Sequence, residues 1–88
     1  MNTKTFAPDE IADIFMNAAD LKVAQNTLGQ KGFPVHRVMS LSYMFTSISD
    51  DCAFVEAGEQ DLRRQFIEEL GDLNHKLNNK LLTVGCDA

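Results

Sequence analysis

Apolar residues recur every three or four positions through most of this chain, and glycine or proline stands at the ends of each such run. This spacing places the apolar side chains on one face of a helix, since an α-helix makes one turn every 3.6 residues. No stretch alternates apolar and polar residues in the way that is typical of a half-buried strand. The sequence therefore predicts an all-α fold.

Three segments carry this helical pattern within a single domain, 1–88. They span residues 8–28, 34–57 and 59–83. Proline opens the first two segments, where its fixed φ suits the first helical turn, and Gly29 and Gly58 follow them. Because only a glycine separates the last two segments, we predict that they form an antiparallel helical hairpin. The ends of the chain, residues 1–7 and 84–88, are expected to be flexible.

The segment 34–57 has apolar side chains on two opposite faces. Its main stripe consists of Val38, Leu41, Met44, Phe45, Ile48, Cys52 and Val55. On a helical wheel, Met39, Tyr43 and Phe54 lie on nearly the opposite side. One interpretation is that this helix is the middle one of three and touches both neighbours. The other is that a second subunit covers the second face, since exposed Met, Tyr and Phe side chains are typical of binding surfaces.

The segment 59–83 has a narrow apolar seam. Its members alternate four and three positions apart, and they are Leu62, Phe66, Leu70, Leu73, Leu77 and Leu81. Gly71 interrupts the segment, which predicts either a close approach of another backbone or a bend. Together the two segments predict a homodimeric helical bundle. Its expected interface, with another subunit or a partner, comprises Met39, Tyr43, Phe54, Phe66, Leu70, Leu73 and Leu77.

Carboxylates gather around the predicted turn of the hairpin. This acidic cluster consists of Asp50, Asp51, Glu56, Glu59 and Asp61, and no positive residue follows before Arg63. A solvated turn that keeps the protein soluble is one interpretation. The other is an acidic docking surface for a basic partner, including imitation of a DNA backbone.

Composition limits the classes of function. With 88 residues the chain forms one small core, so burial against a partner is expected to add stability. A net charge of −5 disfavours binding to nucleic acid or to an anionic membrane. No apolar run has the length of a signal peptide or a membrane span. Cys52 and Cys86 form no CxxC pair, which indicates reduced thiols and a cytoplasmic location.

The residues that could carry chemistry are few. His36 and His75 are the only histidines, and neither belongs to an HxxxH or HxxE pattern that would indicate a metal site. Cys52 follows Asp50 and Asp51 on the main apolar stripe, where a reactive thiolate is disfavoured. We therefore expect no catalytic residue, no metal and no cofactor.

Residues 20–46 offer an alternative function. They contain Lys22, Lys31, His36 and Arg37 and only one acidic residue, Asp20, as a helix-turn-helix unit would require. However, the predicted connection is longer than the usual three or four residues, and the second helix presents few side chains for base contacts.

The sequence combines a short N-terminal element, the helix start "GFPV" and a predicted helical hairpin. In this size and outline the chain resembles small bacterial quorum-sensing anti-activators and phage-encoded inhibitor proteins. The resemblance implies action by occupying the surface of another protein, and it assigns no residue a role. The sequence therefore predicts a non-enzymatic inhibitor, anti-activator or adaptor, with a small DNA-binding regulator as the alternative.

Overall fold

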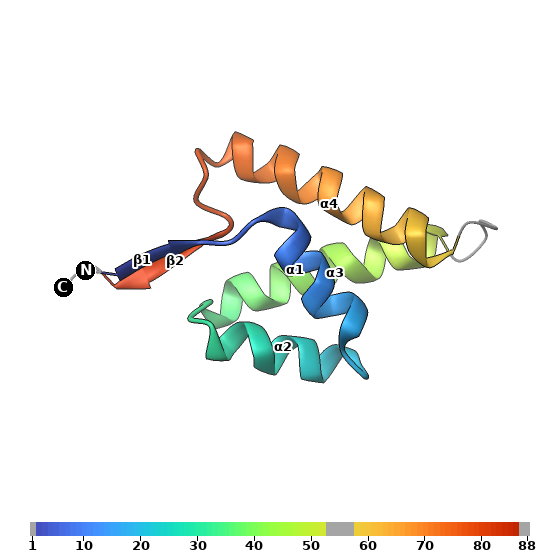
Figure 1. Ribbon diagram of the computed structural model, residues 1–88, viewed down its shortest axis with the longest axis horizontal. Coiled ribbons are helices and arrows are strands. Elements are labelled where there is room, and N and C mark those ends of the chain that lie inside the picture. The colour runs from blue at the N-terminus through green and yellow to red at the C-terminus, as the bar shows by residue number, and fades with distance from the viewer. Residues whose placement is uncertain (1, 53–57, 87–88) are drawn as a thin grey trace.

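Four helices and a two-stranded ribbon make up the residues that the structure describes, 2–52 and 58–86, in this computed structural model (Figure 1). The elements are β1 (Asn2–Thr5), α1 (Pro8–Asn17), α2 (Leu21–Gln30), α3 (Val35–Cys52), α4 (Glu59–Lys76) and β2 (Thr83–Cys86). The prediction of a mostly helical fold is confirmed. The predicted number of three helices is wrong, and so is the expected absence of strands. The predicted last residues of the second helix, 53–57, lie outside the described residues.

The predicted first helix, 8–28, is two helices. The chain leaves the helical conformation at Ala18, and Asp20 begins α2 by accepting a hydrogen bond on Oδ1 from the N–H of Val23 at 2.9 Å. Such a cap replaces a backbone partner that the first turn of a helix lacks. The apolar spacing continues across this break, because both helices place their apolar faces against the same core. Periodicity alone therefore could not locate the break.

The end of α2 is set by Gly32 and not by Gly29, which lies inside the helix. Gly32 has a φ of 105°, and the N–H of Phe33 donates to the carbonyl of Leu28 at 3.2 Å. The N–H of Gly32 donates to the carbonyl of Gly29 at 3.1 Å. These two bonds form a Schellman motif, in which a left-handed residue closes the helix. The motif turns the chain so that α3 begins at Val35, directly after Pro34, whose carbonyl accepts from the N–H of Val38 at 3.0 Å.

The last helix ends earlier than predicted, at Lys76 and not near residue 83. Asn78 and Asn79 have φ values of 57° and 65°, in the left-handed region that asparagine tolerates better than most residues. The side chain of Asn74 then accepts a hydrogen bond from the N–H of Leu82 at 3.2 Å. The reversed chain returns Leu81 and Leu82 to the core, where both are buried.

The ribbon joins the two ends of the described chain. β1 and β2 are antiparallel, with Asn2 opposite Cys86 and Thr5 opposite Thr83. The threonine hydroxyls lie 3.0 Å apart, and the N–H of Phe6 donates to the carbonyl of Leu82 at 2.9 Å. Figure 1 shows the ribbon at one end of the long axis, with the C-terminal end of α3 and the N-terminal end of α4 at the other.

The core connects all four helices. Phe15 of α1, Phe45 of α3 and Phe66 of α4 form a cluster with ring centroids 4.8 to 5.3 Å apart. Its edge-to-face and stacked geometries are those that aromatic rings prefer. α3 contacts α2 as well as α4, and the Cα trace measures 47 × 26 × 18 Å. The fold is therefore flat, and α3 is a middle element with neighbours on two sides.

Gly71 has no neighbour that explains it. A Cβ atom at this position would meet no atom within 4 Å, so the predicted close approach of another backbone is wrong. Gly32 differs, because its φ is one that side chains rarely adopt.

We predict that Gly71→Ala raises the free energy of unfolding by about 0.5–1 kcal/mol, because alanine restricts the unfolded chain and favours the helix. Urea denaturation followed by circular dichroism measures the change. Gly32→Ala is the matched control and should lower the free energy of unfolding. A destabilising Gly71→Ala would mean that the helix needs glycine here.

Candidate functional site

The most exposed apolar side chains of α3 lie on one side of the helix. Val35, Met39 and Tyr43 follow each other at intervals of four residues, and Val35 and Tyr43 are 79% and 70% exposed. On the opposite side of α3, Val38, Leu41 and Ile48 of the predicted main stripe are buried, and Met44 and Phe45 are partly buried against the core. Val55 of that stripe lies outside the described residues. We call the exposed side the outer face of α3; it consists of Val35, His36, Met39, Ser40, Tyr43, Thr46, Ser47 and Asp50.

A groove runs between α2 and the beginning of α3. It has a volume of about 550 Å³, and its lining is Gln25, Asn26, Gly29, Gln30, Phe33, Val35, Val38 and Met39. Gln25 connects its two walls, because Nε2 donates to Ser42 Oγ at 3.2 Å. Ser42 is itself buried and donates to the carbonyl of Val38 at 2.8 Å. The groove therefore combines apolar side chains with amide groups on a fixed pair of helices.

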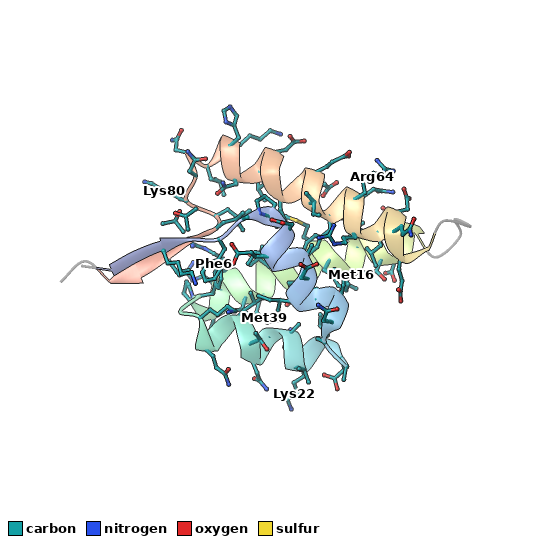
Figure 2. The ribbon with its side chains drawn as sticks, in the orientation of Figure 1. Phe6, Met16, Lys22, Met39, Arg64 and Lys80 are labelled. Atoms are coloured by element: carbon teal, nitrogen blue, oxygen red, sulfur yellow. The ribbon has the colours of Figure 1, made fainter. Side chains whose placement is uncertain are left out.

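The part of the chain that carries this groove has no carboxylate. No Asp or Glu occurs from residue 21 to residue 49, whereas Lys22, Lys31 and Arg37 do. Arg37 Nη1 donates to the carbonyl of Thr83 at 2.7 Å, which ties α3 to the ribbon. Figure 2 shows Lys22 pointing away from α2, on the opposite side of the molecule from Arg64. A chain with a net charge of −5 therefore has one stretch, residues 21–49, in which lysine and arginine are the only charged residue types.

The opposite end of the molecule is acidic. Asp50, Asp51 and Glu59 of the predicted acidic cluster are exposed, while Glu56 lies outside the described residues. Asp61 accepts hydrogen bonds from Arg64 and Gln65, so part of its charge is already balanced within α4. The hydrogen bond with Asp61 and the negative charge of that residue, with that of Glu68, raise the pKa of Arg64 above its usual value.

The other predicted interface residues do not share one surface. Phe66 and Leu70 are fully buried in the core of the chain itself, which leaves them unable to contact a partner. Leu73 is half-buried, and Leu77 is 45% exposed just after α4 ends. Phe54 lies outside the described residues. Met39 and Tyr43 therefore remain as the exposed apolar residues that share one helix face, and Val35 joins them there.

Sequence reasoning missed Val35 and the groove. Val35 precedes Met39 and Tyr43 at the same interval of four, so the helical wheel contained the signal for it. The groove depends on the separate helix α2, which the sequence pattern merged with α1. Because the spacing of apolar residues did not separate α2 from α1, it could not predict a groove that α2 forms with α3.

No arrangement for chemistry is found in the described residues. His36 and His75 are exposed on different helices, and no three His, Cys, Asp or Glu side chains gather there as a metal site would require. Nothing is described of the Cys52 and Cys86 side chains. Among the described helices, none has both the length and the apolar character needed to cross a membrane.

Comparisons of the chain with protein-family models, with curated proteins and with solved structures found no match. Its function is therefore inferred from the outer face of α3, the groove and the distribution of charge.

Proposed function

We propose that this protein acts without catalysis, as a homodimer that binds another protein and serves as an inhibitor, anti-activator or adaptor. The observation that carries the proposal is the exposure of Val35, Met39 and Tyr43 on one side of α3, within a stretch of the chain, residues 21–49, that has no carboxylate. Exposed side chains of this kind, grouped on one helix, lose contact with water when a partner covers them.

The groove supports binding of a segment that is apolar on one side and acidic around it. Phe33, Val35 and Met39 offer apolar contacts, and Asn26 and Gln30 offer amide groups to polar atoms of a partner. The neighbouring cations attract negative charge, because opposite potentials increase the rate and the specificity of association. An amphipathic helix that lays its apolar side into a groove is a common form of such a segment.

We predict that the groove binds a helical peptide with leucine on one side and glutamate on the other. In a titration followed by nuclear magnetic resonance, the amide signals of Gln25, Asn26, Gln30 and Met39 should move. A peptide with lysine in place of glutamate should move them far less, because the surface repels it. In the Val35→Asp variant, the glutamate peptide should no longer move these amide signals.

Leu21→Asp is the control variant for this titration, since Leu21 is also partly exposed but does not line the groove. If the lysine peptide moves the signals of Asp50, Asp51 and Glu59 instead, the acidic cluster is the docking surface. If neither peptide moves any amide signal, then neither the groove nor the acidic cluster binds a target of this kind, and the proposal is contradicted.

Homodimerisation follows from the same exposed face. A domain of this size buries only about 60% of the surface of its unfolded chain, so covering a further apolar face adds stability. We take α3 and α4, which contact each other, as the antiparallel hairpin predicted from the sequence. The outer face of α3 lies outside that contact and is open to a second copy.

We predict a dimer mass for the wild-type chain at micromolar concentration, measured by size-exclusion chromatography with light scattering. Tyr43→Ser should shift the equilibrium toward the monomer, because it removes the largest exposed apolar side chain of α3. Leu21→Ser is the matched control and should leave the mass unchanged. A wild-type monomer mass would contradict the homodimer.

A DNA-binding regulator is the second candidate, and one observation favours it. Because α2 ends at Gln30 and α3 begins at Val35, residues 31–34 form a connection of the length usual in helix-turn-helix units. The objection of an overlong connection therefore no longer applies. The supply of positive side chains is still small, since only Lys22, Lys31 and Arg37 lie between residues 21 and 49.

If the protein binds duplex DNA, we predict that the logarithm of its affinity falls with the logarithm of salt concentration with a slope of about −3, because about three phosphates are neutralised. Lys31→Ala should reduce the magnitude of this slope by about 1. Lys76→Ala, at the end of α4, should not change it. Absence of DNA retention at low salt dismisses this candidate.

A further inference from the structure

We propose that Lys4 and Lys31 form a carboxylate-binding site at one end of the groove, where they hold acidic side chains of the target protein. We call these two residues the lysine pair. The inference rests on the target binding proposed above, and it names the residues that recognise the charge of the target segment. Lys4 belongs to β1 and Lys31 to the turn after α2, so only the fold brings them together.

The two ammonium groups of the lysine pair converge on one aromatic ring. Nζ of Lys4 lies 4.8 Å from the ring centroid of Phe6, and Nζ of Lys31 lies 5.7 Å from the same centroid. The ring attracts both cations, but the two like charges repel each other. Both lysines are exposed, and neither belongs to the ion pairs of the described residues, which Arg63 and Arg64 form. An anion between the ammonium groups offsets their repulsion, so the lysine pair is suited to bind one.

The lysine pair lies next to the apolar lining of the groove. Phe33 lines the groove, and its ring centroid is 5.3 Å from that of Phe6. Lys31 directly follows Gln30, which also lines the groove. Figure 2 shows Phe6 beside the base of the ribbon. A target segment that places an apolar side chain against Phe33 therefore brings its neighbouring polar side chains to the lysine pair.

The ribbon is held against the connection between α2 and α3, and this fixes the backbone of Lys4. In the register of the ribbon, Lys4 lies opposite Val84. The side chain of Val84 lies 3.7 Å from the position that a Cβ atom on Gly32 would occupy. Arg37 acts as a positioning residue, because its Nη1 donates to the carbonyl of Thr83 in the same strand as Val84. Charges that are already in place lose less conformational freedom on binding.

The sequence around the lysine pair favours an acidic occupant. The segments that supply the pair, the groove and the ribbon are 1–8, 21–49 and 73–86, and none of them contains Asp or Glu. Glu10, in the first turn of α1, accepts a hydrogen bond from the N–H of Ala7 at 3.1 Å and pairs with neither lysine. Asp87 lies outside the described residues. Charge complementarity therefore selects a segment with carboxylates over a basic one. These three segments hold six lysine and arginine residues: Lys4, Lys22, Lys31, Arg37, Lys76 and Lys80.

Two peptides and two substitutions test the lysine pair. Lys4→Gln and Lys31→Gln each remove one charge and keep most of the side chain. We expect each variant to bind the glutamate peptide of the groove titration about threefold more weakly, and the double variant about tenfold more weakly, as exposed ion pairs would. A peptide with glutamine in place of glutamate offers no carboxylate, so its affinity should not change. Fluorescence anisotropy of labelled peptides gives the dissociation constants.

Lys22→Gln is the matched control for this experiment. Lys22 is exposed on α2, and it neither lines the groove nor contacts Phe6. Its substitution changes the net charge by the same amount and so measures the effect of overall charge on association. The dissociation constant of the glutamate peptide should change by less than about twofold, because the distant charge is screened by salt. Circular dichroism of each variant checks that the helical content is preserved.

The outcomes separate this inference from target binding by the groove. If the wild type binds neither peptide, the proposed target binding fails, and the role of the lysine pair fails with it. If the wild type binds the glutamate peptide and the two variants lose no more affinity than Lys22→Gln, target binding stands and the lysine pair is overturned. Equal weakening of both peptides means that the lysines act through the fold, which also overturns it.

Duplex DNA supplies the remaining arm of the test, since phosphates could occupy the same site as carboxylates. If the wild type is retained on DNA at low salt, the double variant is not, and the glutamate peptide does not bind, then the lysine pair serves a nucleic acid. That result overturns the inference.

Discussion

The contact of Phe15, Phe45 and Phe66 fixes the orientation on which the rest of the surface depends. These rings bring α1, α3 and α4 together within centroid distances of 4.8 to 5.3 Å. Because Phe45 faces this cluster, α3 cannot rotate about its axis without losing the core. Tyr43 lies two positions earlier, about 200° away on the helix, and must therefore face outward. The exposed face of α3 is thus a consequence of core packing.

The core stripe of α3 could be predicted because its signal is local and repeated. Val38, Leu41 and Ile48 recur at helical spacing, and all three are buried. The same wheel placed Met39 and Tyr43 opposite them, where they are exposed. The break at residues 18–20 could not be predicted in this way, since the apolar pattern continues through it. Only the cap at Asp20 marks it, and Asp is common at many positions that begin no helix.

The ribbon and the end of α4 were missed for a different reason. β1 and β2 pair residues far apart in sequence, as the contact of Thr5 with Thr83 illustrates, and no alternating pattern accompanies them. The seam predicted to continue to Leu81 ends because Asn78 and Asn79 reverse the chain. Leu81 is buried all the same, but through the return of the chain toward β1. Correct identification of a buried residue therefore did not reveal the element that buries it.

The composition of the outer face of α3 favours a protein over a nucleic acid as the partner. Reading base edges requires side chains such as Arg, Asn or Gln on the exposed side of the helix, and this face has none of them. Its most exposed apolar members are Val35 and Tyr43, which gain most from contact with a surface that excludes water. Arg37, the one arginine of α3, already binds the carbonyl of Thr83. The lack of carboxylates around the groove suits a nucleic acid as well as an acidic protein, but the side chains on α3 itself favour the protein.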